Sequence, residues 1–157
     1  MKNLSQLKSK GFTLLEVLIS VLVLSTGLLG VAGLQLTGLK NNYNSELRSQ
    51  AKQLAYDIAD RMRSNPTEAN SGSSYLIDIA ELATSTIDCE ANSCSEADMA
   101  KYDLNSWKSA LRLKLPSGDG KITFLGLPSK RQYSITVQWD DSRGENTVKT
   151  FTLRTEI

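Results

Sequence analysis

The chain has 157 residues, of which 40% are hydrophobic and 22% charged, with 18 Lys and Arg against 17 Asp and Glu and no histidine. Without histidine, nucleophiles that depend on a histidine base and the common histidine-bearing zinc sites are excluded. A net charge of +1 provides no overall field for nucleic acid, so such binding would need a local basic patch. We predict a protein that is not an enzyme and has neither a metal site nor a cofactor.

Apolar residues are concentrated near the N-terminus. Residues 17–39 carry no charged side chain, and Glu16 is the single charge in residues 12–39. As a helix, residues 17–39 would span about 35 Å at about 1.5 Å per residue, which covers a bilayer core of about 30 Å. Residues 1–10 contain three lysines and no acid. This bias predicts a cytoplasmic N-terminus, with the remainder of the chain placed across the membrane.

Three fates are open to this segment. It could be a signal peptide, for which Gly30-Val31-Ala32 offers small residues suited to cleavage after Ala32. It could be a plain uncleaved anchor, or the helix left behind when a shorter leader is cut off before it. The first two give no role to Glu16, although an acid inside a membrane costs a few kcal/mol unless it is paired or kept near the interface.

Residues 10–18, Lys-Gly-Phe-Thr-Leu-Leu-Glu-Val-Leu, resemble the processing site of type IV pilins and related pseudopilins. The resemblance implies that a prepilin peptidase cuts between Gly11 and Phe12 and methylates the new amino group of Phe12. It also implies that Glu16 assists assembly by meeting the positive N-terminus of a neighbouring subunit. An acid in lipid needs such a partner. We therefore expect a leader over 1–11, a transmembrane and filament-core helix over 12–40 and a periplasmic head over 41–157.

Beyond residue 39 the pattern becomes amphipathic. Apolar residues recur at spacings of three or four, which places them on one helical face: Leu47, Ala51, Leu54, Ile58 and Met62. Ser64-Asn65-Pro66 supplies a stop, because the residue before proline avoids helical geometry. We predict one helix from Phe12 to about Arg63, with its amphipathic part over 41–64, followed by a loop over 65–74.

The middle of the head combines an acidic block, a cysteine pair and a second helix. Residues 78–103 hold seven acids and one lysine, which we interpret as a solvated surface. Cys89 and Cys94 would face an oxidising space in an exported domain, so we predict a disulfide between them. Ser95, with Asp98 three residues later, has the form of a capping box and predicts a helix to about Leu113. Its Trp107 is expected in the core.

From Leu115 onward the apolar period becomes two, which predicts an antiparallel sheet over 115–157. Residues 116–120 form a predicted turn, residues 121–125 a strand, and residues 133–139 and 151–155 alternate between apolar and polar side chains. A turn is expected over 140–146. The sheet should pack on the apolar face of 41–64. The fold class is therefore α+β, with a type IV pilin fold: a long N-terminal helix whose C-terminal half packs on a small sheet, plus a short extra helix.

The head resembles the minor pilin family PilV more narrowly. The shared features are the cysteine pair, a following helix with Asp103 and Trp107, the Leu-Pro-x-Gly-x-Gly turn from Leu115, and a strand ending in Trp139-Asp140. This resemblance implies a structural subunit that assembles with other minor and major pilins and helps to initiate or modify the type IV pilus. Its further partner would be the pilus assembly machinery of the inner membrane. It would reside first in the bacterial inner membrane, with its head in the periplasm, and then in the pilus.

Two other functions stay open at this stage. A pseudopilin of a type II secretion system would share the same leader and helix. Alternatively, the head could bind DNA or a surface through a basic patch, composed of Lys108, Arg112, Lys114, Lys121, Lys130 and Arg131. The adjacent acids Asp140 and Asp141 are better explained as turn residues than as paired catalytic carboxylates, because neighbours on an extended chain point to opposite sides.

Overall fold

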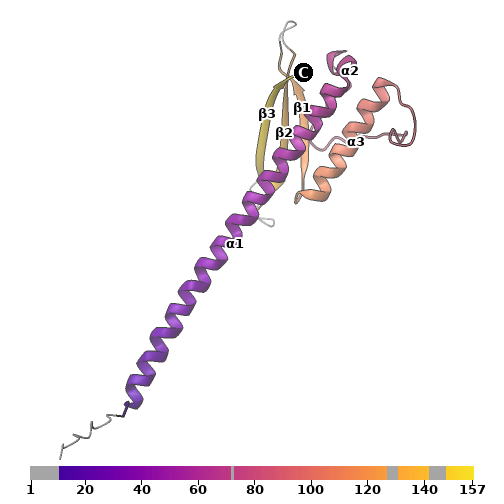
Figure 1. Cartoon of the computed structure of the whole chain (residues 1–157). Helices are drawn as coiled ribbons and strands as arrows, with labels where there is room; N and C mark the ends of the chain where they lie inside the picture. The colour runs from indigo at the N-terminus through magenta and orange to yellow at the C-terminus, as the bar shows by residue number, and fades with distance from the viewer. Residues whose placement is uncertain (1–10, 72, 127–130, 142–147) are drawn as a thin grey trace, which may run out of the picture. The chain divides into compact units, whose positions relative to one another are not determined.

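The computed structural model describes residues 11–71, 73–126, 131–141 and 148–157. The elements in chain order are α1 (Leu14–Ser64), α2 (Pro66–Ser71), α3 (Glu96–Lys114), β1 (Asp119–Phe124), β2 (Gln132–Asp140) and β3 (Val148–Glu156) (Figure 1). The chain divides into two units, one ending at Asn42 and the other comprising Tyr43–Ile157. Helix α1 contributes residues to both units.

In the second unit, the apolar face predicted for α1 is buried. All five of its predicted positions, from Leu47 to Met62, are at most 5% exposed, because a spacing of three or four keeps them on one side of the helix. Helix α1 ends at Ser64, as the following Asn65-Pro66 predicted. The loop predicted over 65–74 is wrong in part, since α2 occupies Pro66–Ser71. Proline suits the first position of a helix, where its missing N–H has no partner to lose.

The three strands form one antiparallel sheet in the order β1-β2-β3. Strand β2 is central and alternates as predicted, with every second residue from Tyr133 to Trp139 buried. Strand β1 begins at Asp119, two residues earlier than the sequence predicted. The early start is possible because Gly120 has no side chain, since a Cβ there would lie 2.6 Å from the indole of Trp107.

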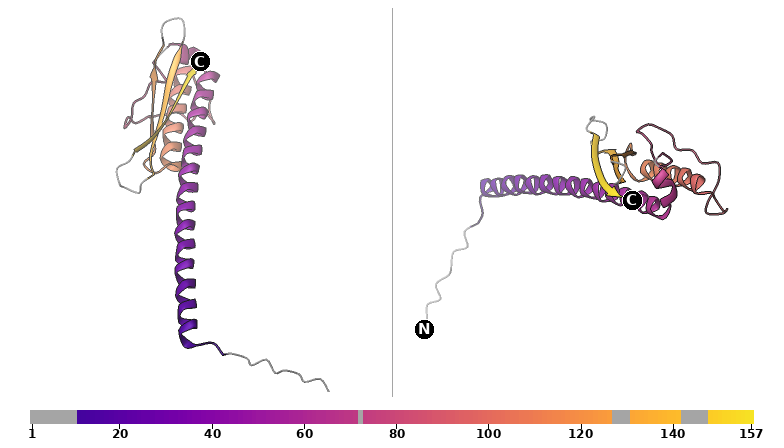
Figure 2. Two further views of the ribbon diagram at one scale, coloured as in Figure 1. Left: turned by 90° about the vertical axis from the view of Figure 1, so that its left-hand side faces the viewer. Right: turned by 90° about the horizontal axis from the view of Figure 1, so that it is seen from above.

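The C-terminal part of α1 and helix α3 form a layer against one face of the sheet (Figure 2). Trp107 of α3 is completely buried, and its Nε1 donates a hydrogen bond of 2.9 Å to the carbonyl of Leu54 in α1. An ion pair of 3.3 Å between Arg61 and Asp103 joins the same two helices. The predicted α+β architecture, a long helix on a small antiparallel sheet with short extra helices, is therefore confirmed.

Candidate functional site

The start of α1 is capped by Thr13. The Thr13 Oγ1 accepts a hydrogen bond of 3.3 Å from the backbone N–H of Glu16, and the Thr13 carbonyl accepts bonds from the N–H groups of Glu16 and Val17 at 3.1 and 3.3 Å. A Thr followed three residues later by Glu is the spacing of a capping box. Sequence reasoning assigned Glu16 to assembly and missed the cap, although the spacing was readable.

Glu16 lies in a groove of about 390 Å³ on the first turns of α1, between the side chains of Phe12 and Ser20. Phe12 is 83% exposed, and Glu16 is exposed as well. Among the described residues, no side chain pairs with the Glu16 carboxylate. Gly11 and Phe12 precede the first helical residue, so the peptide bond between them lies in exposed, non-helical chain.

The apolar part of α1 has the length and composition to cross a membrane, and none of its most apolar stretch is buried within the chain. Its hydroxyl groups bond within the helix. The Ser20 Oγ donates to the Glu16 carbonyl at 2.7 Å, and the Thr37 Oγ1 donates to the Gly33 carbonyl at 3.1 Å. Ser25 and Thr26 bond to earlier carbonyls in the same way. These groups need no water, which suits an apolar surrounding.

Four glycines lie along this stretch, with open space where a Cβ would stand: Gly27, Gly30, Gly33 and Gly38. Helix α1 is continuous through all four. Small residues allow helices to approach each other closely within membranes.

A buried polar network joins α1, α3 and the segment between them. The Tyr75 hydroxyl donates to Asp103 Oδ2 at 2.8 Å, Arg61 pairs with the other carboxylate oxygen, and Asn65 Nδ2 donates to the Tyr75 hydroxyl at 3.2 Å. Burial raises the pKa of Tyr75, and the hydrogen bond to Asp103 acts in the same direction. Tyr75 therefore remains a neutral donor, and the network holds the helices in place.

The basic patch predicted for the head is wrong at Lys108. This side chain is 1% exposed, and its Nζ lies 2.6 Å from Asp119 Oδ1 and 2.8 Å from the carbonyl of Asp78. Asp119 also accepts hydrogen bonds from the N–H groups of Ala80 and Gly120. Burial opposes ionisation of Asp119, but these bonds outweigh it and hold the pKa of Asp119 below its usual range. The predicted Lys130 lies outside the described residues.

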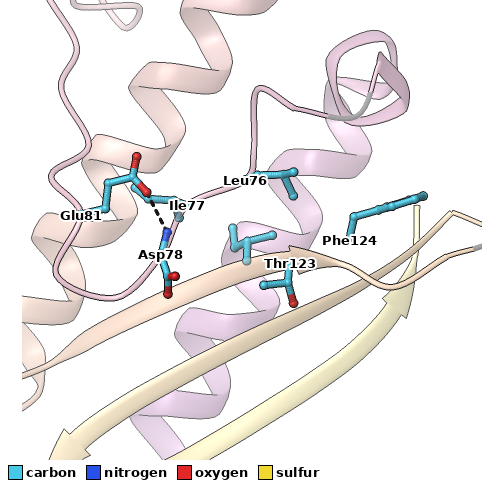
Figure 3. A pocket seen from close by; sticks show the side chains of 7 residues that line it. Leu76, Ile77, Asp78, Glu81, Thr123 and Phe124 are labelled. Atoms are coloured by element: carbon cyan, nitrogen blue, oxygen red, sulfur yellow. Dashed lines mark hydrogen bonds between the residues drawn. The ribbon is translucent and has the colours of Figure 1, made fainter.

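A second groove, of about 350 Å³, lies at the outer edge of β1 (Figure 3). Its lining includes Phe124 and the pair Ile77 and Ile122, which form a short antiparallel bridge. The Glu81 carboxylate accepts a bond of 2.9 Å from the N–H of Asp78, so it stabilises a turn. In the described part of the chain, no group of three or more Asp, Glu or Cys side chains could hold a metal ion.

Cys89 and Cys94 form a disulfide with a Cα–Cα distance of 5.5 Å, as predicted. The next residue, Ser95, is the N-cap of α3: its Oγ accepts from the N–H of Asp98 at 3.2 Å and donates to the Asp98 carboxylate at 2.7 Å. The predicted capping box is therefore confirmed. The disulfide fixes the chain directly before the helix start.

We expect the double substitution Cys89→Ser, Cys94→Ser to lower the free energy of unfolding by about 2 kcal/mol, because the disulfide closes a short loop and removes little chain entropy. Urea titration followed by tryptophan fluorescence measures this change. Amide hydrogen exchange should rise most in the first turn of α3, beside Ser95. Two free thiols in the protein isolated from cells, measured by mass spectrometry, would contradict a structural disulfide.

Two family models match the chain. Residues 6–32 match the prokaryotic N-terminal methylation motif, and residues 33–105 match the model described as Type IV pilin Tt1218. The first match includes the Gly11–Phe12 bond and Glu16, and the second extends from α1 through the disulfide into α3. No curated protein and no solved structure matches the chain.

Proposed function

We propose that this type IV pilin-like chain, a structural and non-enzymatic protein with an N-terminal methylation motif, is a minor pilin. One observation carries the proposal: the methylation motif coincides with the exposed apolar part of α1, in which Glu16 has no side-chain partner among the described residues. In this proposal residues 1–11 are the leader, residues 12–40 the transmembrane and filament-core helix, and residues 41–157 the periplasmic head.

The proposed first step is removal of the leader. The methylation motif implies processing by a prepilin peptidase and assembly with other pilins. The peptidase would hydrolyse the bond between Gly11 and Phe12, releasing the leader with the Gly11 carboxyl group and leaving a free amine on Phe12 for methylation. The exposure of Phe12 and its position before the first helical residue support access to this bond.

The proposed second step is insertion into the filament. A membrane and pilus location is typical of proteins with this motif, and the lysines of the leader favour a cytoplasmic N-terminus. The apolar helix would leave the bilayer and become buried among the helices of other subunits. Glu16, which has no partner among the described residues of its own chain, would pair with the amine at the N-terminus of a neighbouring subunit.

The minor rather than major role rests on the resemblance of the head to the PilV family. A pseudopilin of a type II secretion system is the alternative that shares the same helix. A head that binds DNA is less well supported than the sequence suggested, because Lys108 is buried and paired with Asp119 and cannot reach a phosphate.

The N-terminal mass of the protein isolated from cells tests the proposal. We expect methylated Phe12 at the N-terminus. An N-terminus at Gly33 would instead support a cleaved signal peptide, and an intact Met1 would support a plain anchor; either result would overturn the proposal. Recovery of the chain from sheared pili, at far lower abundance than the main subunit, separates a minor pilin from a major pilin and from a secretion pseudopilin.

A further inference from the structure

Helices α1 and α3 run antiparallel in the head, which fixes where α3 ends. Asp103 meets Arg61, and four residues further along α3, Trp107 meets Leu54, which lies seven residues earlier in α1. The last turn of α3, residues 112–114, lies about 9 Å beyond Trp107 by helix rise, which is the level of about Arg48 in α1, close to the start of the unit. We call the end of the head that contains Tyr43 the proximal end, because α1 enters the unit there.

Strand β3 starts at the same end. Near its finish, Thr155 accepts a hydrogen bond from Arg63, late in α1. Val148 lies seven residues earlier, about 23 Å away at about 3.3 Å per residue. It pairs with Asp140, whose N–H donates to the carbonyl of Pro116, just after α3. Figure 1 shows α3 ending and β3 beginning at the end of the head opposite α2.

The proximal end presents apolar side chains beside cations. Leu113 is 86% exposed, more than any other large apolar side chain described, and Arg112 and Lys114 flank it. Val148 is 58% exposed and precedes Lys149. Within the described residues, these three cations form no ion pair. Cations in the last turn suit the dipole of α3, but the dipole does not explain an exposed leucine between them.

Acids also lie near this end. Glu46 lies on α1, Asp140 ends strand β2, and Asp141 follows it. Arg48 adds further positive charge on α1, so the cations named here outnumber the acids. Tyr43 itself is 44% exposed, and amphipathic aromatic residues of this kind are enriched at membrane interfaces. The proximal end therefore has the composition of a surface for an anionic interface.

We propose that the proximal end, consisting of Tyr43, Arg112, Leu113, Lys114, Val148 and Lys149, docks on anionic lipid headgroups while the subunit awaits assembly. The inference rests on the proposed function, in which the apolar helix spans the membrane. Tyr43 follows the last apolar residue of that span, Leu39, by four residues in the same helix. Leu113 and Val148 enter the headgroup layer, while the neighbouring lysines and Arg112 meet the lipid phosphates. Release of this contact accompanies entry into the filament.

The test uses the full chain in vesicles. A fluorescent probe is attached to Leu113→Cys, and Asn70→Cys on α2 provides the matched site at the opposite end; the native cysteines are bonded and take no label. Quenching by headgroup spin-labelled lipid is compared in neutral vesicles and in vesicles containing phosphatidylglycerol. We expect strong quenching at residue 113, weak quenching at residue 70, and an increase at residue 113 with anionic lipid.

Neutralising two lysines tests whether their charge causes the docking. The double substitution Lys114→Gln, Lys149→Gln should lower the ratio of docked to free heads by about tenfold in anionic vesicles. Lys101→Gln, in the first half of α3, is the matched control and should change nothing. If the chain stays bound to vesicles, equal quenching at both sites would overturn the docking proposal alone. Quenching that follows protein density instead of lipid charge would do the same. Loss of the chain from vesicles after alkaline extraction would overturn the proposed function as well.

Discussion

We expect replacement of Glu16 by alanine to lower entry of the chain into pili by about tenfold or more. An unpaired acid in lipid costs a few kcal/mol, so in the proposed mechanism pairing of Glu16 on assembly favours the filament. Alanine removes this gain, and about 1.4 kcal/mol is a factor of ten. In the proposed filament, removal of the carboxylate would leave the amine of the neighbouring subunit without its partner. Cleavage after Gly11 and methylation of Phe12 should continue. The measurement is the amount of processed chain in sheared pili relative to the amount in the membrane.

The structure shows why this substitution tests the charge and not the helix. Thr13 caps α1 through the backbone N–H of Glu16, which alanine retains. Ser20→Ala is the matched control, because Ser20 lines the same groove and its hydroxyl donates a hydrogen bond to the Glu16 carbonyl and not to the carboxylate. Glu16→Gln preserves shape without charge and should behave like Glu16→Ala. Normal entry of Glu16→Ala, or an equal defect in Ser20→Ala, would show that the charge is not the cause.

Periodicity made the scaffold predictable. The spacing of Leu47 to Met62 defined the buried face of α1, and the alternation from Tyr133 to Trp139 defined the buried face of β2. Proline and the capping box marked where helices end and begin. These signals are local, so they can be read before any contact between distant residues is known.

Contacts between distant elements were not predictable in the same way. Lys108 looked like a surface cation because lysine seldom becomes fully buried. Its partner, Asp119, lies eleven residues away, in the first position of β1, and the turn at Ala80 completes the site. Ala80 has a φ of 63°, a left-handed conformation that is uncommon for a residue with a Cβ, and its N–H donates a hydrogen bond of 2.7 Å to Asp119 Oδ2. None of this is visible in the sequence as a pattern.

Replacement of Lys108 by alanine is expected to lower the free energy of unfolding of the head by about 3 to 5 kcal/mol, because it leaves the Asp119 carboxylate without its cation. Lys108→Met should cost less, since methionine fills the space of the lysine stem. Lys101→Ala, on the exposed side of the same helix, is the matched control and should change little. Urea unfolding in detergent, followed by the fluorescence of the buried Trp107, measures all three variants.

The pH dependence gives the same prediction a second readout. A carboxylate whose folded pKa is depressed stabilises the protein above its unfolded pKa, about 3.9 for Asp, and loses that contribution as pH falls through the folded value. Burial alone would raise the pKa of Asp119, but its hydrogen bonds to Lys108 and to backbone N–H groups lower it in the fold. The native head should therefore lose stability below about pH 4. In Lys108→Met, burial disfavours the charged form of Asp119 and no cation opposes this effect. Protonation of Asp119 at low pH therefore removes the cost of burying its charge. The difference in free energy of unfolding between the native protein and Lys108→Met should therefore narrow as pH falls below about 4. A difference that stays constant as pH falls would mean that the ion pair does not hold Asp119 and the Ala80 turn together.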